Sequence, residues 1–237
     1  MKFIVGLADK YIEINSVYDA LRNFFKDYLV TDVTPDFSVS LNQEDISAEQ
    51  EVTSENQFSP TYLETLALLR KLAEILPSHN RILMHGASIS YNEHAYLFTA
   101  PSGTGKSTHT RLWYQNIPDA KLLNDDSPIV RYIDNKLWVY GSPWSGKTAC
   151  YKNEKYEIAA IVRLSQAPSN HIKRLSTLES YGALHPSFPP GFAYDNTLYE
   201  HIGNIIGECL THTPVFHLQC LPNVDAALLC KNTIYKI

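Results

Sequence analysis

Apolar residues recur at strand and helix periods along the whole chain, and they divide it into many short elements. In the first 80 residues "FIVGLA", "YIEINS" and "DFSVSL" predict strands, and "VYDALRNFFKDYLV" predicts a helix. Ser59 followed by Pro60 predicts the start of a strongly amphipathic helix that stops near Pro77, because a serine cap with proline in the first turn is typical of helix N-termini. The polar, acidic residues 42–57 predict a solvated loop. Together these patterns predict a small α+β N-terminal region.

The pattern changes at Arg81. "RILMHGASIS" and "EHAYLFTA" predict two strands with a turn at Tyr91-Asn92, and "STHTRLWYQ" predicts a helix after a glycine-rich loop. Later segments predict two strands in "KLLNDDSPIVRYI", strands in "KLWVYG", "YEIAAIVRL" and "VFHLQC", and helices in "DNTLYEHIGNIIGECL", capped by Asp195, and "NVDAALLC". We therefore expect an α/β fold with a mixed β-sheet around a strand–loop–helix core, divided into residues 1–80 and 81–237.

Composition narrows the class of protein. A net charge of −5 with only 20 Lys and Arg argues against nucleic acid as the main partner. The four cysteines show no C-x-x-C spacing, so we expect free thiols rather than a zinc site or disulfides. The apolar run at the start is short and is interrupted by Asp9, unlike a signal peptide, and no run of about 18 apolar residues occurs. These features predict a cytoplasmic protein without a membrane partner.

Two stretches resemble a phosphate-binding loop. "GSPWSGKT" at Gly141 to Thr148 fits the G-x-x-x-x-G-K-[ST] pattern, whereas "APSGTGKST" has Ala100 at the first glycine position. A phosphate loop needs a strand before it, small residues within it and a helix directly after it, so that backbone N–H groups and the lysine meet the anion. Residues 100–108 satisfy all three conditions. The alternative interpretation is a glycine-rich turn with a solvated lysine.

The second stretch fails the same test. Pro143 has no N–H to offer and Trp144 is too bulky for a close approach of the backbone, while the residues that follow predict a strand rather than a helix. We therefore expect residues 141–148 to match the pattern by accident, with Lys147 open to a lesser role at the rim of the same site.

Acidic residues and a histidine flank the first loop in sequence. Asp125 and Asp126 follow the apolar run "KLL" about 20 residues beyond the loop. Adjacent residues on a strand point in different directions, so one carboxylate can approach a metal while the other faces an incoming hydroxyl. The alternative is a surface Asp-Asp-Ser-Pro turn. His85, in "LMHGAS" at the end of a strand before the loop, is either catalytic or a structural hydrogen-bonding residue.

A known family shows these features in the same order. "LMHGASISYNEHAYLFTAPSGTGKST" followed by "LLNDD" resembles the HPr kinase/phosphorylase family of the phosphoenolpyruvate carboxykinase-like P-loop superfamily, which has a His-Gly strand, a G-x-S-G-x-G-K-S loop and paired aspartates. "YGSPWSGK" is similar to a loop of small HPr-kinase-like proteins of unassigned substrate. The resemblance covers roughly residues 81–165.

The resemblance implies roles for particular residues. Lys106 would hold the β- and γ-phosphates, Ser107 and Asp126 would bind magnesium, and Asp125 would act as general base with His85 holding it, although the two aspartates could exchange roles. Lys147 would stand at a substrate or phosphate rim. Arg163 is a candidate cation for the same rim, although it does not match the family's arginine-bearing segment. The nucleotide-binding residues would be Ser102, Gly103, Thr104, Gly105, Lys106, Ser107 and Thr108.

The chain also departs from the family. Ala100 replaces the first loop glycine, and the arginine-bearing segment that engages HPr has no convincing counterpart. Residues 1–80 do not resemble the family's accessory domain, so HPr itself is not the expected acceptor. Family members form oligomers, which implies a homo-oligomer here.

The leading hypothesis is an ATP- and magnesium-dependent kinase that phosphorylates a hydroxyl of a small protein, a peptide or a small molecule. Residues 1–80 would recognise the substrate or a partner. The alternative is a nucleotide-binding sensor or scaffold with little catalysis, in which Asp125→Asn would leave the biological role intact. Carboxykinase chemistry on oxaloacetate is disfavoured by the short chain and its few arginines. GTP or pyrophosphate as donor, and the reverse phosphorylase reaction, remain open.

Overall fold

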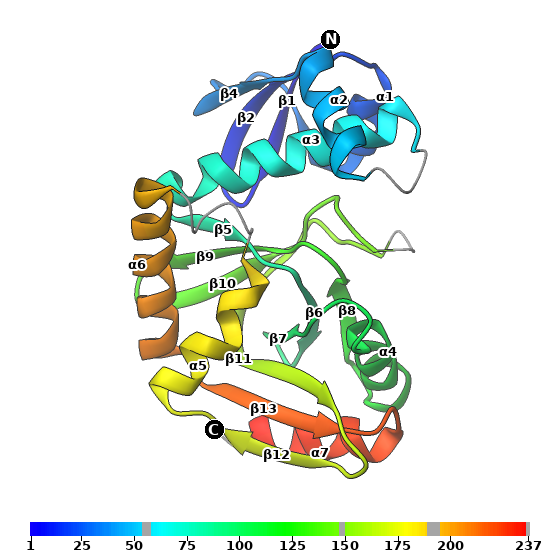
Figure 1. Cartoon of the computed structure of the whole chain (residues 1–237), viewed down its shortest axis with the longest axis vertical. Coiled ribbons are helices and arrows are strands. Elements are labelled where there is room, and N and C mark those ends of the chain that lie inside the picture. The colour runs from blue at the N-terminus through cyan, green and yellow to red at the C-terminus, as the bar shows by residue number, and fades with distance from the viewer. Residues whose placement is uncertain (54–57, 147–149, 189–194, 236–237) are drawn as a thin grey trace. The chain divides into compact units, whose positions relative to one another are not determined.

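The computed structural model describes residues 1–53, 58–146, 150–188 and 195–235. The chain forms two compact units, Met1–Leu76 and Pro77–Ile237. It is a mixed α/β protein, as the sequence predicts, with a small mixed sheet in the first unit and a large mixed sheet in the second (Figure 1).

The first unit is built on a four-stranded sheet in the order β3-β1-β2-β4. The central hairpin turns at Ala8 and Asp9, both with left-handed backbone, and β4 runs parallel to β2. The strands are β1 (Lys2–Leu7), β2 (Lys10–Asn15), β3 (Leu29–Val30) and β4 (Phe37–Ser40). The helices are α1 (Ala20–Phe24), the 3-10 helix η1 (Lys26–Tyr28), α2 (Gln43–Val52) and α3 (Pro60–Ile75).

Two expectations for this unit were wrong. Most of the stretch predicted as a solvated loop forms helix α2, because the Asn42 side chain accepts the N–H of Asp45 while the Asp45 carboxylate accepts the N–H of Asn42. Buried Ile46 and the Glu49–Arg70 ion pair then attach α2 to the unit. The helix predicted from "VYDALRNFFKDYLV" is only the short α1 and η1, since the chain continues into β3. Residues 54–57 of the predicted loop lie outside the described residues.

The second unit contains a nine-stranded sheet in which β11 (Lys155–Gln166) is the central element. Residues 155–157 of β11 pair antiparallel with β10, residues 157–163 pair parallel with β7, and residues 161–166 pair parallel with β13. The other strands are β5 (Arg81–Leu83), β6 (Gly86–Tyr91), β7 (His94–Thr99), β8 (Lys121–Asn124), β9 (Ile129–Ile133), β10 (Lys136–Tyr140), β12 (His171–Arg174) and β13 (Val215–Cys220).

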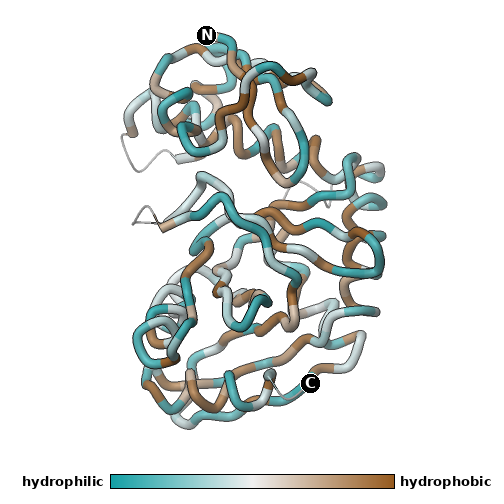
Figure 2. Tube along the Cα trace, turned by 180° about the vertical axis from the view of Figure 1, so that it is seen from behind, coloured by the Kyte–Doolittle hydropathy of each residue, from teal (hydrophilic) through white to brown (hydrophobic). Residues whose placement is uncertain are grey.

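Apolar side chains from the two faces of this sheet form two cores. One core contains Leu97 and Ile161 with residues of α5 (Thr177–Leu184) and α6 (Asn196–His212). The other contains Phe98 and Val162 with residues of α4 (Lys106–Asn116) and α7 (Val224–Ile234). Figure 2 shows the corresponding brown, hydrophobic stretches within the strands and teal at many of the turns. Two short 3-10 helices, η2 (Leu76–His79) and η3 (His185–Ser187), complete the fold.

The segment predicted as one strand from Arg81 is broken into β5 and β6 at Met84 and His85. The backbone N–H groups of residues 84–86 donate to carbonyls of Pro128, Ser187 and Asp126, so the chain changes partners at this point. The following turn lies at Asn92-Glu93, both with positive φ, one residue later than predicted. None of the described helices is long and apolar enough to cross a membrane.

Candidate functional site

The glycine-rich loop connects β7 to α4, as the sequence predicts. Gly103 and Gly105 have φ angles of +77° and +115°, a backbone conformation that side chains rarely adopt. Helix α4 begins at Lys106 without a side-chain cap at Gly105. The first N–H groups of the helix are therefore available to an anion. Ala100 is buried in the core beside α4, so its methyl group is accommodated at the position where the family has glycine.

Lys106 is buried at the start of this helix, with 8% of the residue exposed. Its ammonium group donates to the Ala100 carbonyl at 3.0 Å and lies 2.8 Å from His85 Nε2. Burial lowers the Lys106 pKa, Asp126 opposes the shift, and Arg163 adds to it. The lysine is thus a desolvated cation with a carboxylate and a second cation close by.

His85 lies between Lys106 and Asp126. Its Nδ1 is 3.6 Å from Asp126 Oδ1, and burial and the Lys106 charge lower its pKa. A neutral imidazole can accept a hydrogen bond from the Lys106 ammonium group at Nε2 and direct its Nδ1–H toward Asp126. The sequence placed His85 at the end of the strand before the loop, and the resemblance implied that it holds the base, given as Asp125 with an exchange for Asp126 left open. The histidine instead faces Asp126 and occupies the junction of β5 and β6.

Asp125 points to a different segment of the chain. Its Oδ1 accepts the Gly146 N–H at 2.6 Å, and the Cys150 thiol donates to the same carboxylate. Burial, together with this hydrogen bond, raises the pKa of the thiol to about 12. The two adjacent aspartates therefore face different partners, and Asp125 anchors Gly146 and Cys150 against the end of β8.

Asn124 is a residue of this site that the sequence reasoning missed. Its amide donates to the Ser142 and Trp144 carbonyls at 3.0 Å each. Its Oδ1 accepts the N–H groups of Asp126 and Ser127 at 3.0 and 3.1 Å. A fully buried asparagine that ends an apolar strand just before two aspartates is the signal that could have identified it.

We expect Asn124→Leu to destabilise the larger unit by about 3 kcal/mol or more, since it leaves several buried backbone groups without partners. Chemical unfolding followed by tryptophan fluorescence measures this, because all three tryptophans belong to this unit. Asn116→Leu, at the exposed end of α4, is the matched control and should change stability by less than about 0.5 kcal/mol. Equal stability of the two variants would contradict this role for Asn124.

The second loop has a different architecture from the first. Trp144 is buried, and the described residues after the loop, from 150 to 154, are not helical before β11 begins at Lys155. Lys147, expected at the rim of the site, lies outside the described residues. The segment Gly141–Gly146 is held by Asn124 and Asp125 as part of the wall beside the aspartates.

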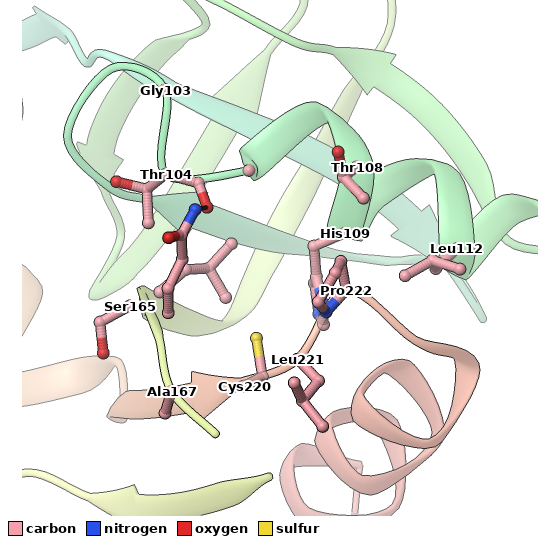
Figure 3. Close-up of a pocket in the computed structure, with 13 residues that line it drawn as sticks. Gly103, Thr104, Thr108, His109, Leu112, Ser165, Ala167, Cys220, Leu221 and Pro222 are labelled. Carbon is pink, nitrogen blue, oxygen red and sulfur yellow. Dashed lines mark hydrogen bonds between the residues drawn. The ribbon is translucent and has the colours of Figure 1, made fainter. Parts of the chain in front are cut away.

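A cavity of about 570 Å³ lies on the α4 side of the glycine-rich loop. Figure 3 shows it between the start of α4 and the segment 220–222, with Thr104 and Ser165 at one end and Leu112 at the other. Gln166 donates from its side chain to the Thr104 carbonyl at 3.2 Å and so links the end of β11 to the loop. The volume and the mixed lining suit a nucleoside-sized ligand.

Of the predicted loop residues, Gly103, Thr104, Gly105 and Thr108 line this cavity. Ser102 and Arg163 line a second cavity of about 460 Å³, which also contains Gly103 and Thr104. His109, which the sequence did not single out, is buried beside the first cavity, accepts the Trp113 indole N–H at 3.0 Å, and has a pKa lowered to about 4 by burial.

Magnesium is the metal that the resemblance implies. Ser107 is exposed on the first turn of α4, and the aspartate pair supplies carboxylate oxygens, which are the donors that magnesium prefers. Among the described residues no three His, Cys, Asp or Glu side chains are grouped to hold a metal ion. Magnesium usually takes one or two protein ligands together with substrate phosphates, and the residues present fit that pattern.

No protein-family model matches the chain, and no curated protein matches it by sequence. Among solved structures, the Hpr(Ser) kinase/phosphatase from Coxiella burnetii is similar with a TM-score of 0.37 at 11% identity. That match covers 65% of this chain and 88% of the other. It is a distant likeness in fold.

Proposed function

We propose that this protein is a nucleotide- and magnesium-dependent phosphotransferase that phosphorylates a hydroxyl group of its acceptor. The observation that carries the proposal is the position of Lys106. It is a buried lysine at the first residue of a helix, behind a loop with two left-handed glycines, and it contacts His85 within reach of the Asp126 charge. Phosphoryl transfer needs this combination of phosphate cradle, cation and positioned carboxylate.

The nucleotide would be ATP, with its phosphates at the N–H groups of residues 103–107 and its nucleoside in the 570 Å³ cavity. Lys106 would exchange its contacts with Ala100 and His85 for the β- and γ-phosphates. Magnesium, with the Ser107 hydroxyl among its ligands, would neutralise the charge that develops between those phosphates.

We assign the reacting carboxylate to Asp126. His85 lies next to Asp126, and the Asp126 side chain is 37% exposed. Asp125 Oδ1, in contrast, already accepts the Gly146 N–H. The acceptor hydroxyl oxygen attacks the γ-phosphorus, the bond to the β-phosphate oxygen breaks, and the hydroxyl proton passes to Asp126. The resemblance gave the base role to Asp125 and left an exchange of the two aspartates open, and these contacts support Asp126. We further propose residues 1–76 as the unit that recognises the acceptor or a partner.

Calorimetric titration with magnesium and ATP tests the nucleotide site. We expect Lys106→Ala to weaken binding at least about 100-fold, because it removes a desolvated cation from the phosphates. Lys147→Ala should change affinity by less than about threefold, and Lys121→Ala, an exposed lysine on β8, is the matched control. Unchanged binding in Lys106→Ala, or a loss confined to Lys147→Ala, would mean that the loop at residues 100–108 is not the phosphate site.

A further inference from the structure

Arg163 lies at the centre of a row of polar residues that crosses four strands. In the register of the sheet it pairs with Thr99 of β7 on one side and His217 of β13 on the other, and His217 pairs with Lys173 of β12. Residues paired in this way project from the same face of a sheet. Because the neighbouring residues Leu164 and Val162 pack in the core beside α4 and α7, the row lies on the opposite face.

The guanidinium group of Arg163 has no hydrogen bond or ion pair within the described part of the chain. Burial lowers its pKa, and no carboxylate offsets that effect. Leaving a half-buried guanidinium unpaired costs free energy, and the usual compensation is a bidentate carboxylate or phosphate. The hydroxyl of Thr99, fully buried next to Arg163 in the row, also has no hydrogen-bond partner among the described residues.

The neighbours of Arg163 form a recess rather than a flat surface. The 460 Å³ cavity is bounded by Pro101–Thr104 of the glycine-rich loop, Arg163–Gln166 and His217. It adjoins a smaller recess of about 320 Å³ that shares Arg163 and His217 and also contains Lys173 and Glu179. Ser165 and His217 hydrogen-bond to each other at 2.9 Å, and Lys173 pairs with Glu179 at 2.8 Å.

The charges around this recess are mainly positive. Besides burial, the charges of Lys173, Arg163 and His171 lower the His217 pKa. Arg163 is also close enough to Lys106 to lower the lysine pKa. Asp126 lies next to His85 and does not affect the Arg163 pKa, and Glu179 is already paired with Lys173. An anion placed at Arg163 would therefore meet an unpaired cation within electrostatic reach of the phosphate site.

We propose that Arg163, supported by His217 and Ser165, binds a carboxylate or phosphate group of the acceptor. The acceptor is then an anionic compound or peptide whose hydroxyl lies next to that group, rather than a neutral alcohol. This inference rests on the proposed function, because the anion subsite is useful there only if a phosphoryl group is delivered from the loop beside it. The nucleoside would occupy the cavity beside α4, which shares Gly103, Thr104 and residues 164–166 with the recess but is not lined by Arg163 or His217.

The test uses the full-length protein saturated with magnesium and a non-hydrolysable imido analogue of ATP, which fills the phosphate loop. Inorganic phosphate and malonate, two anions of similar charge, are then titrated by calorimetry. We expect saturable binding of at least one of them, weakened at least about tenfold in Arg163→Gln. Affinity for the ATP analogue should stay within about threefold of wild type. Arg174→Gln is the matched control, because this exposed arginine on β12 pairs with Phe216 and so projects from the other face.

The anion that binds more tightly identifies the anionic group of the acceptor. Tighter binding of phosphate indicates an acceptor that carries a phosphate, and tighter binding of malonate indicates one that carries a carboxylate. The proposal is overturned if neither probe binds, if Arg163→Gln binds them as wild type does, or if Arg163→Gln loses the ATP analogue as Lys106→Ala should. In each of these cases the proposed function still stands provided that Lys106→Ala abolishes nucleotide binding. Retention of the ATP analogue by Lys106→Ala would instead reject the proposed function.

Discussion

Gly141→Ala is expected to destabilise the larger unit by about 3 kcal/mol or more, one of the largest effects of any single methyl group in this chain. A Cβ at this position would lie 1.8 Å from the Lys152 carbonyl oxygen, a backbone atom that cannot rotate away. The two backbone segments that would have to separate are each held by hydrogen bonds. Gly141 donates to the Glu154 carbonyl at 3.0 Å, and Lys152 donates to the Leu123 carbonyl of β8 at 3.1 Å.

Gly203→Ala provides the matched control for this prediction. Gly203 lies in helix α6 with nothing within 4 Å of an added Cβ, so alanine there should stabilise by roughly 0.5–1 kcal/mol. Urea unfolding followed by tryptophan fluorescence compares the two variants within the same unit. A Gly141→Ala protein as stable as wild type would show that the backbone around Lys152 yields readily, contrary to the packing described above.

The contact at Gly141 also gives a packing reason for the glycines of the second loop. The first glycine of "GSPWSGKT" is required by the close approach of the Lys152 carbonyl, and Gly146 lies against the Asp125 carboxylate, whose Oδ2 is 3.0 Å from the position of an added Cβ. Both glycines serve packing and hydrogen bonding within a loop. Sequence context alone, a proline and a tryptophan without a following helix, was enough to rank this loop below residues 100–108.

Local sequence signals predicted most of the elements of the fold. The helix that begins at Pro60 and the helix capped by Asp195 follow from caps that act within a few residues. Helix α2 was missed although its capping box, Asn42 with Asp45, is equally local, because its acidic and polar composition suggested a loop. The break between β5 and β6 could not be predicted, since it depends on carbonyls of Pro128 and Ser187, which are distant in sequence.

In the candidate site, too, some features follow from local sequence and others depend on contacts between distant parts of the chain. The residues of the glycine-rich loop and the divergent directions of the two aspartates follow from sequence. The pairing of His85 with Asp126 depends on the break at Met84, and the row that contains Arg163 and His217 depends on the parallel register of β11 and β13. Arg163 was recognised only as a candidate cation, because nothing in the sequence says which residues lie beside it.

Asp126→Asn is expected to slow phosphoryl transfer by about 10²–10⁴-fold while leaving nucleotide affinity within about threefold of wild type. The amide keeps the shape of the carboxylate but cannot take up the proton of the attacking hydroxyl. Release of phosphate from magnesium-ATP measures the effect, with water standing in for the acceptor hydroxyl, and calorimetry measures nucleotide binding in parallel.

Asp125→Asn tests whether Asp126 or Asp125 is the general base. An asparagine oxygen can still accept the Gly146 N–H, so the segment Gly141–Gly146 should stay in place and the rate should fall by less than about tenfold. If Asp125→Asn abolishes turnover and Asp126→Asn does not, the base is Asp125 and the contact between His85 and Asp126 serves the fold. If neither change affects turnover while Lys106→Ala still abolishes nucleotide binding, the protein binds nucleotide without using either carboxylate as a base, as the sensor hypothesis requires. The pair of variants thus decides both which aspartate reacts and whether the site is catalytic.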